Sequence, residues 1–217
     1  MRRAIKRLIP AFAVVMTAVV AGPQVAGGAP KDKQPVIDDA TMIPVTGAFS
    51  QLDRSEDGVA TKVRTAANSG HANTLWYVIF NAPENCNGGV CGEDDIFVAP
   101  GVPNEDQIQA ARVSVLWSGA GAVTNPAGRL SLGGGLAEGE VPDGPNQVVI
   151  GRGDDGALVP LSPVTGLEDA LGAEVHIVVQ DHGPAHEDQT LRDMQLTQFM
   201  GACNPDCVDI QFAVHQP

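Results

Sequence analysis

The hydrophobic positions of the chain fall into short runs, many of them alternating with a period of two, which is the pattern of β-strands. Residues 59–65 alternate Val and Thr with Lys and Arg, as expected of a strand with one face in solvent. Residues 74–81 form a continuous apolar and aromatic run, which is typical of a strand buried on both faces. Further strands are predicted at 95–99, 112–117, 121–124, 129–132, 147–150, 157–161, 174–180, 191–199 and 208–215.

The last of these strands alternates most regularly. Val208, Ile210, Phe212 and Val214 share one face, and Asp209, Gln211, Ala213 and His215 share the other. This pattern predicts an antiparallel sheet with one apolar side and one wet side.

Helical patterns are few and short. Residues 104–111 begin with an Asn that can cap a helix, and residues 165–171 can form a turn or two before Gly172. The 25 Gly and 16 Pro are spread along the chain as turn residues. We therefore predict an all-β fold, an antiparallel β-sandwich of Greek-key type, as one domain over residues 42–217. Residues 29–41 are polar with two prolines, which indicates a flexible leader.

The first 28 residues have the order of a secretory signal peptide. A basic start is followed by the apolar run 8–21 and then by small residues, with cleavage expected after Ala21 or after Gly28. The apolar run is shorter than the roughly 20 residues that span a bilayer, so we expect no transmembrane segment after cleavage. The mature protein is then secreted or extracytoplasmic, in a periplasm or at the cell exterior.

The chain is strongly acidic. Asp and Glu total 26 against 13 Lys and Arg, and the segment 1–28 carries four of the positive charges and no acid, so its removal takes the net charge from −13 to −17. Such a balance argues against a nucleic-acid partner, because phosphate contacts need clustered Lys and Arg. Small acidic groups along the chain favour a solvated surface. A calcium site is an alternative, and it would have to be assembled from separate loops.

Four cysteines form two local pairs, each in a turn-rich segment. In an exported chain they favour disulfides, either locally as Cys86–Cys91 and Cys203–Cys207 or crosswise between the two segments. A four-thiolate zinc site is a further alternative, since both spacings suit it. Neither pair has the two-residue spacing of thioredoxin-like redox motifs.

Three of the five histidines lie within eleven residues. His176 is in a predicted strand, and His182 and His186 follow in a loop with Asp181. If that loop folds back, imidazoles and a carboxylate converge on a Zn or Cu ion. The alternative is that His176 is a strand residue with satisfied hydrogen bonds and that the other two are loop residues near acids.

Residues 173–185, with His176-Ile177 and Gly183-Pro184, and residues 119–132 before them resemble the layout of chordin-type (CHRD) domains. These are extracellular β-sandwich modules similar in shape to copper-zinc superoxide dismutase, with a strand-borne His-Ile-His and a following Gly-Pro turn. The resemblance covers residues 42–216, and Val178 stands where the second His is expected. It implies an extracellular β-sandwich and does not carry over a metal site.

Two functional hypotheses follow. The first is a secreted, non-enzymatic β-sandwich that binds an extracellular protein or surface through its cysteine-clipped loops. The second is a Zn- or Cu-binding metalloprotein or metalloenzyme that uses His176, His182, His186 and Asp181.

Overall fold

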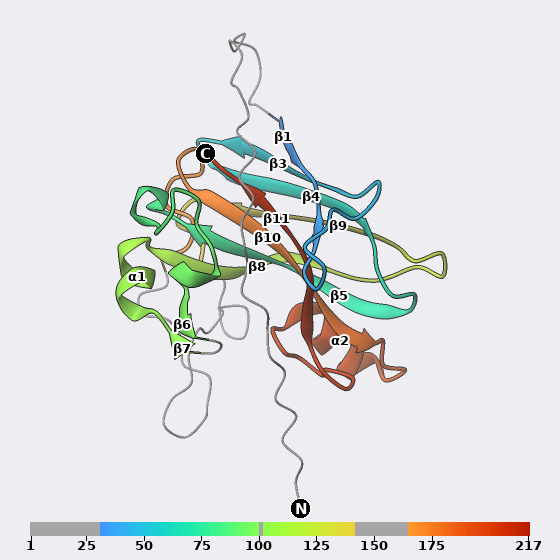
Figure 1. Cartoon of the computed structure of the whole chain (residues 1–217). Helices are drawn as coiled ribbons and strands as arrows, with labels where there is room; N and C mark the ends of the chain where they lie inside the picture. Colours follow the sequence, from blue (N-terminus) through green and yellow to red (C-terminus); the bar gives the residue numbers. More distant parts are fainter. Residues whose placement is uncertain (1–30, 100–101, 142–164) are drawn as a thin grey trace, which may run out of the picture.

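Two antiparallel sheets pack face to face in the computed structural model, which describes residues 31–99, 102–141 and 165–217 (Figure 1). The four-stranded sheet has the order β1 (Lys31–Gln34), β3 (Phe49–Ser55), β4 (Gly58–Ala66), β9 (Arg129–Ala137). The five-stranded sheet has the order β2 (Ile37–Asp38), β11 (Val208–His215), β10 (Glu174–Pro184), β5 (His71–Phe80), β8 (Val113–Val123). The predicted antiparallel β-sandwich is therefore confirmed.

Smaller elements cover one end and one face of the sandwich. They are the 3-10 turns η1 (Pro83–Asn85) and η2 (Glu93–Asp95), the two-stranded sheet β6 (Phe97–Ala99) and β7 (Val102–Pro103), and the helices α1 (Glu105–Ala110) and α2 (Gln189–Thr197). None of the helices in the described ranges is long and apolar enough to span a membrane. The expected signal segment 1–28 and the predicted strands at 147–150 and 157–161 lie outside the described residues.

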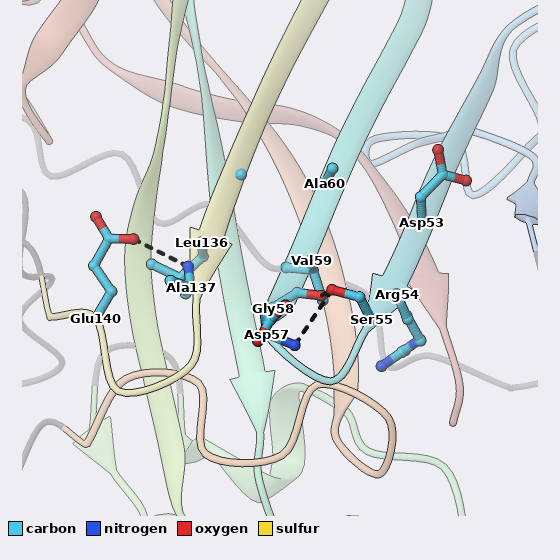
Figure 2. A pocket seen from close by; sticks show the side chains of 11 residues that line it. Asp53, Arg54, Ser55, Asp57, Gly58, Val59, Ala60, Leu136, Ala137 and Glu140 are labelled. Atoms are coloured by element: carbon cyan, nitrogen blue, oxygen red, sulfur yellow. Dashed lines mark hydrogen bonds between the residues drawn. The ribbon is translucent and has the colours of Figure 1, made fainter. Parts of the chain in front are cut away.

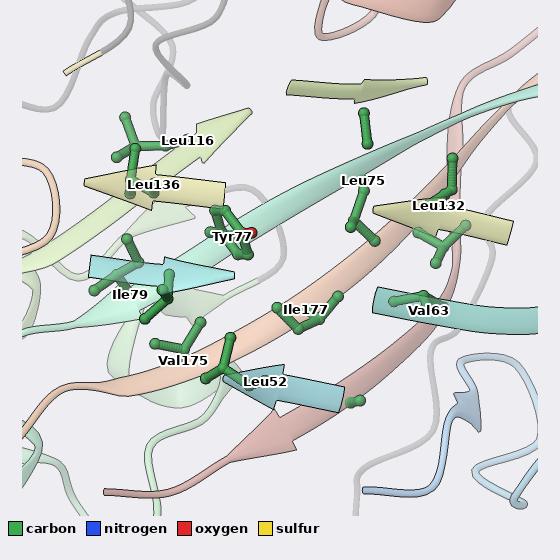
Figure 3. Close-up of a cluster of buried hydrophobic side chains, with 14 of the residues drawn as sticks. Leu52, Val63, Leu75, Tyr77, Ile79, Leu116, Leu132, Leu136, Val175 and Ile177 are labelled. Atoms are coloured by element: carbon green, nitrogen blue, oxygen red, sulfur yellow. The ribbon is translucent and has the colours of Figure 1, made fainter. Parts of the chain in front are cut away.

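The main hydrophobic core lies between the two sheets (Figure 3). Fully or almost fully buried aliphatic side chains line it from both sides, and Tyr77 joins them from β5: Leu52, Val63, Leu132 and Leu136 from the four-stranded sheet, and Leu75, Tyr77, Ile79, Leu116, Val175 and Ile177 from the five-stranded sheet. Alternate residues of each strand point into this layer, which is what the period of two requires.

A second hydrophobic cluster lies on the opposite, outer face of the five-stranded sheet. Trp76 and Phe80 of β5 point to this face, where Ile108 of α1 and Phe199 after α2 pack over the sheet. The rings of Trp76 and Phe199 meet edge to face at 5.4 Å. β5 is thus covered on both faces, as its continuous apolar run predicted.

The faces of β11 are the reverse of the prediction. Gln211, Ala213 and His215 point inward and are buried, whereas Phe212 and Val214 are half-buried on the outer side. Ile210 lies at a register shift and packs, half-buried, against the core between the sheets. Each inward polar group has a partner: the Gln211 amide bonds to Thr65 and to the carbonyl of Ala66, and His215 bonds to Ser50 and Asp32. These hydrogen bonds offset the desolvation free energy that burying the polar side chains would otherwise cost.

Four other segments differ from expectation or refine it. The helix expected at 104–111 is α1, but residues 191–199 form most of a helix and not a strand, because the Asp188 carboxylate caps α2 by accepting from the Leu191 N–H (3.0 Å). Residues 165–171 form no helix, since Leu167 is buried and bridges to Glu138. The expected leader supplies β1 and β2, so the sandwich begins before residue 42.

Candidate functional site

The four residues predicted to bind a metal all lie on or just after β10, in different surroundings. His176 and His182 are six strand residues apart, which is about 20 Å along the chain, so one ion cannot contact both. His176 donates from Nε2 to the Glu174 carboxylate (2.7 Å) and stacks at a tilt on Phe80. It therefore belongs to the far end of the strand from His182.

Asp181 and His186 also have their own partners. The Asp181 carboxylate accepts from His71 Nδ1 (2.9 Å) and from the backbone N–H of Gly183 (2.7 Å). His186 donates from Nε2 to the Ala202 carbonyl (3.2 Å), so its ring lies against the 201–207 segment, as that of His182 does. Of the four predicted ligands, only His182 and His186 face the same loop.

The cysteines form the two local disulfides, Cys86–Cys91 and Cys203–Cys207, and no Cys is free. The crosswise pairing and the four-thiolate zinc site are therefore wrong. The Cys86–Cys91 disulfide closes the first clipped loop, which lies between β5 and η2. The Cys203–Cys207 disulfide closes the second clipped loop, which lies between α2 and β11. Two groups of metal-ligating atoms lie within 4.8 Å of one another in the described ranges, and each contains one of these pairs: His182 with Cys203 and Cys207, and Cys86 with Cys91 and Asp95.

Two buried carboxylates hold the first clipped loop. Glu174 of β10 accepts from the backbone N–H of Cys91 (3.0 Å) as well as from His176. Asp95 accepts from the backbone N–H groups of Asn87 (2.8 Å) and Gly92 (2.9 Å). These charge-assisted hydrogen bonds connect the loop to itself and to the sheet, so its backbone is fixed.

The second clipped loop is built around His182, which is fully buried beneath it. The Thr74 hydroxyl accepts from Trp76 Nε1 (2.8 Å) and lies 2.8 Å from His182 Nε2. His182 Nδ1 lies 3.2 Å from the Gly201 carbonyl and 3.1 Å from Cys207 Sγ. A carbonyl only accepts, so Nδ1 carries the proton and Nε2 accepts from Thr74. Burial lowers the pKa of His182, against the opposing effects of the Gly201 carbonyl and Asp181.

Glycine at position 183 allows the second loop to approach β10. Its φ is +81°, and a Cβ there would lie 1.8 Å from the Asn204 carbonyl oxygen. Gln195 of α2 ties the same region together, because its amide donates to the carbonyls of His182 (3.1 Å) and Pro184 (3.2 Å) and accepts from the His186 N–H (2.9 Å). Helix, loop and strand are thus one rigid unit around the imidazole.

A third polar arrangement has the order of a catalytic triad. Ser50 Oγ lies 2.9 Å from His215 Nε2, and His215 Nδ1 donates to Asp32 Oδ2 at 2.6 Å. Ser50 and His215 have no exposed surface, because they lie between the sheets, and Arg54 donates to the His215 carbonyl beside them. A substrate cannot reach a nucleophile in that position, so the chain of hydrogen bonds ties β1, β3 and β11 together.

Sequence reasoning missed this network and also the pairing of His182 with Cys207. Ser50 and His215 are 165 positions apart, and His182 and Cys207 are 25 apart. Neither separation is a recognisable motif, and only the strand register brings these side chains together.

A shallow surface pocket of about 420 Å³ lies at the β3–β4 turn and the end of β9 (Figure 2). Asp53, Asp57 and Glu140 surround it, together with Arg54. The Arg54 guanidinium is occupied by the carbonyls of Ala170 (2.7 Å) and Ala173 (2.8 Å). Neither His182 nor the Ser50 hydroxyl lines this pocket, and the hydroxyl that does, that of Ser55, donates to the Gly58 carbonyl (3.2 Å) and accepts from the Asp57 N–H (3.3 Å).

Exposed apolar side chains gather at the two clipped loops. Of the ten large hydrophobic residues that are exposed in the described ranges, three belong to the region of the first disulfide and three to that of the second: Val90, Val98 and Val102, and Leu191, Met200 and Val208. Both regions pack on the outer face of the five-stranded sheet through the second hydrophobic cluster.

Comparison with known proteins places the chain in no family: no family model matches it, and no curated protein or solved structure does so either.

Proposed function

We propose that this protein is an extracytoplasmic, non-enzymatic binding module that recognises another protein through its two clipped loops. The observation that carries the proposal is the set of exposed apolar side chains on and beside these loops, among them Val98, 64% exposed, and Met200, 47% exposed. Apolar surface in water is costly, and patches of it on a folded domain mark interaction sites. The two disulfides, which form and persist in oxidising compartments, support a location outside the cytoplasm.

The rigidity of the loops supports the same function. The disulfides, the Glu174 and Asp95 carboxylates and the Gln195 amide hold the loop backbones before any partner arrives. A surface that is already ordered loses less conformational entropy on binding, so more of the contact free energy becomes affinity. Binding, and not catalysis, suits a chain whose Ser50 and His215, hydrogen-bonded to each other, are sealed between the sheets.

Charge indicates the chemistry of the partner. Exposed carboxylates surround the apolar side chains at both loops: Glu84, Glu93 and Asp94 at the first, and Glu187, Asp188 and Asp206 at the second. The Arg112 side chain near the first loop is already paired with Glu168. An interface typically has an apolar centre and a polar rim, and opposite charges on the rims speed encounter. We therefore expect a protein partner with an apolar centre and a basic rim.

The test uses the full chain with a photo-crosslinking amino acid at one position at a time. Val98 and Met200 are the loop positions, and Lys62, exposed on the solvent face of β4, is the matched control. Irradiation in the native envelope should crosslink a single partner protein at Val98, at Met200 or at both. It should crosslink no protein at Lys62. The double variant Glu93→Lys/Asp94→Lys should weaken a crosslink at Val98.

The proposal fails if irradiation gives no protein adduct at either loop, or the same adducts at Lys62. It also fails if the charge-reversed chain is crosslinked as efficiently as the wild type, because the partner would then not be basic.

A further inference from the structure

We infer that His182, Cys203 and Cys207 form a zinc site when their disulfide is reduced by a dithiol. The imidazole nitrogen and the two sulfur atoms already lie within 4.8 Å of one another, with His182 Nδ1 3.1 Å from Cys207 Sγ. In a tetrahedral site, Zn–S and Zn–N bonds of about 2.3 and 2.0 Å put neighbouring ligand atoms about 3.5–3.8 Å apart. The three-residue spacing between the cysteines is within the range that zinc sites use.

The imidazole is held in the orientation that a metal ligand needs. Thr74 faces Nε2 and is itself fixed by the Trp76 N–H, so the ring edge with Nδ1 points at the disulfide. When zinc takes the lone pair of Nδ1, the ring proton moves to Nε2, which then donates to the Thr74 hydroxyl oxygen. Ligating histidines almost always donate their other N–H to such a partner. Thr74 is thus a positioning residue of the site.

The electrons and protons of the step balance. A thiolate of the dithiol attacks the Cys203 sulfur, the Cys203–Cys207 bond breaks, and Cys207 leaves as a thiolate beside the His182 Nδ1–H. The second thiol of the reductant then displaces Cys203, so the dithiol becomes a disulfide and the two cysteines are reduced by two electrons. Binding of Zn²⁺ keeps both sulfurs deprotonated and releases the two thiol protons to water.

The first disulfide is an internal control with the opposite surroundings. Cys86 and Cys91 lie beside the Asp95 carboxylate, whose two oxygens already accept backbone N–H groups. Cys91 is buried, and Glu174 is hydrogen-bonded to its backbone. Negative charge and burial both disfavour thiolates, whereas Cys203 and Cys207 are half-exposed and next to an imidazole.

The experiment titrates the full chain with Zn²⁺ after reduction with a phosphine and desalting, against a chromogenic chelator, and uses the oxidised chain as the blank. We expect one ion per reduced chain and none per oxidised chain. Alkylation followed by mass spectrometry then locates the site in the wild type without any substitution. Zn²⁺ should protect Cys203 and Cys207 and leave any reduced Cys86 and Cys91 open to the reagent.

Three variants separate ligation from folding. Cys86→Ser/Cys91→Ser should still bind one ion, and Cys203→Ser/Cys207→Ser should bind none. Thr74→Val should keep the stoichiometry and weaken the affinity about 10- to 100-fold, as loss of an outer-shell partner does. The inference is overturned if the reduced chain takes up no zinc, if Zn²⁺ protects only Cys86 and Cys91, or if reduction unfolds the chain and Zn²⁺ does not restore the fold. It does not depend on the proposed binding function.

Discussion

Tyr77 offers a direct test of the core between the sheets. It has no exposed surface, its hydroxyl donates to Thr61 Oγ1 at 2.9 Å, and burial raises its pKa to about 12 in spite of that hydrogen bond. It is also the only tyrosine in the chain, so the absorbance of phenolate reports this residue alone. The perturbation is Tyr77→Phe, which keeps the ring and removes the titrating group.

The expected magnitude follows from the two pKa values. An unfolded tyrosine ionises near pH 10, so between about pH 10 and pH 12 the unfolded chain releases a proton that the folded chain keeps. Because the folded pKa is raised, stability is complete below pH 10 and falls as the pH rises through this window, by about 2–3 kcal/mol. Near pH 7, Tyr77→Phe loses only a hydrogen bond, which costs about 1 kcal/mol.

The two stability curves must therefore cross. Urea unfolding followed by tryptophan fluorescence should find the wild type more stable near pH 7 and Tyr77→Phe more stable near pH 12. Thr61→Val is the control, since it removes the same hydrogen bond and keeps the alkaline loss. Parallel curves for wild type and Tyr77→Phe, or phenolate absorbance rising near pH 10 in the folded chain, would refute a sealed core around this residue.

Four further substitutions probe the core and the loops. Ile177→Ala should lower the free energy of unfolding by about 2–5 kcal/mol in urea titrations, because its side chain is 1% exposed between the sheets. Ser50→Ala should cost about 1–3 kcal/mol by leaving His215 Nε2 without a donor, and hydrolysis of p-nitrophenyl acetate should not change; a Ser50-dependent rate would show that substrate reaches the core. Burial lowers the pKa of His215, against the effect of Asp32. As the pH drops below about 6.5, the unfolded chain therefore takes up a proton before the folded chain does, and stability should fall. The melting temperature of His215→Gln should fall less over that range. Gly183→Ala should lower the melting temperature of the chain and speed amide hydrogen exchange at the second loop, because its Cβ would lie 1.8 Å from the Asn204 carbonyl oxygen. Gly47→Ala, whose Cβ would meet no atom within 4 Å, should lower the melting temperature less.

The strand pattern could be predicted from sequence where burial decides the residue types. β5 is an example, because a strand covered on both faces has to be apolar at successive positions, and residues 74–80 are mostly so. β11 is the opposite case. Its more polar face turned inward, since Thr65, Ser50 and Asp32 on other strands supply hydrogen-bond partners that one strand's pattern does not reveal.

The histidine cluster was predicted from proximity in sequence, and strand geometry disperses it. An extended chain moves about 3.3 Å per residue, so residues as close in sequence as His176 and His182 end at opposite ends of one strand. The partner that does approach His182 is Cys207, from the loop before β11, the strand that pairs with β10. The disulfides were predictable for the contrary reason, because four or five residues in a turn bring two Cα atoms to 5.1 Å.

The two faces of β5 stabilise different parts of the fold. Tyr77 and its neighbours on one face pack between the sheets, while Thr74 and Trp76 on the other support the second loop through the His182 hydrogen bond and the Phe199 contact. Trp76 also belongs to the hydrophobic cluster beneath the first loop. Adjacent residues of one strand thus stabilise different layers: Tyr77 is bonded into the sandwich itself, and Trp76 supports the surface on which both clipped loops rest.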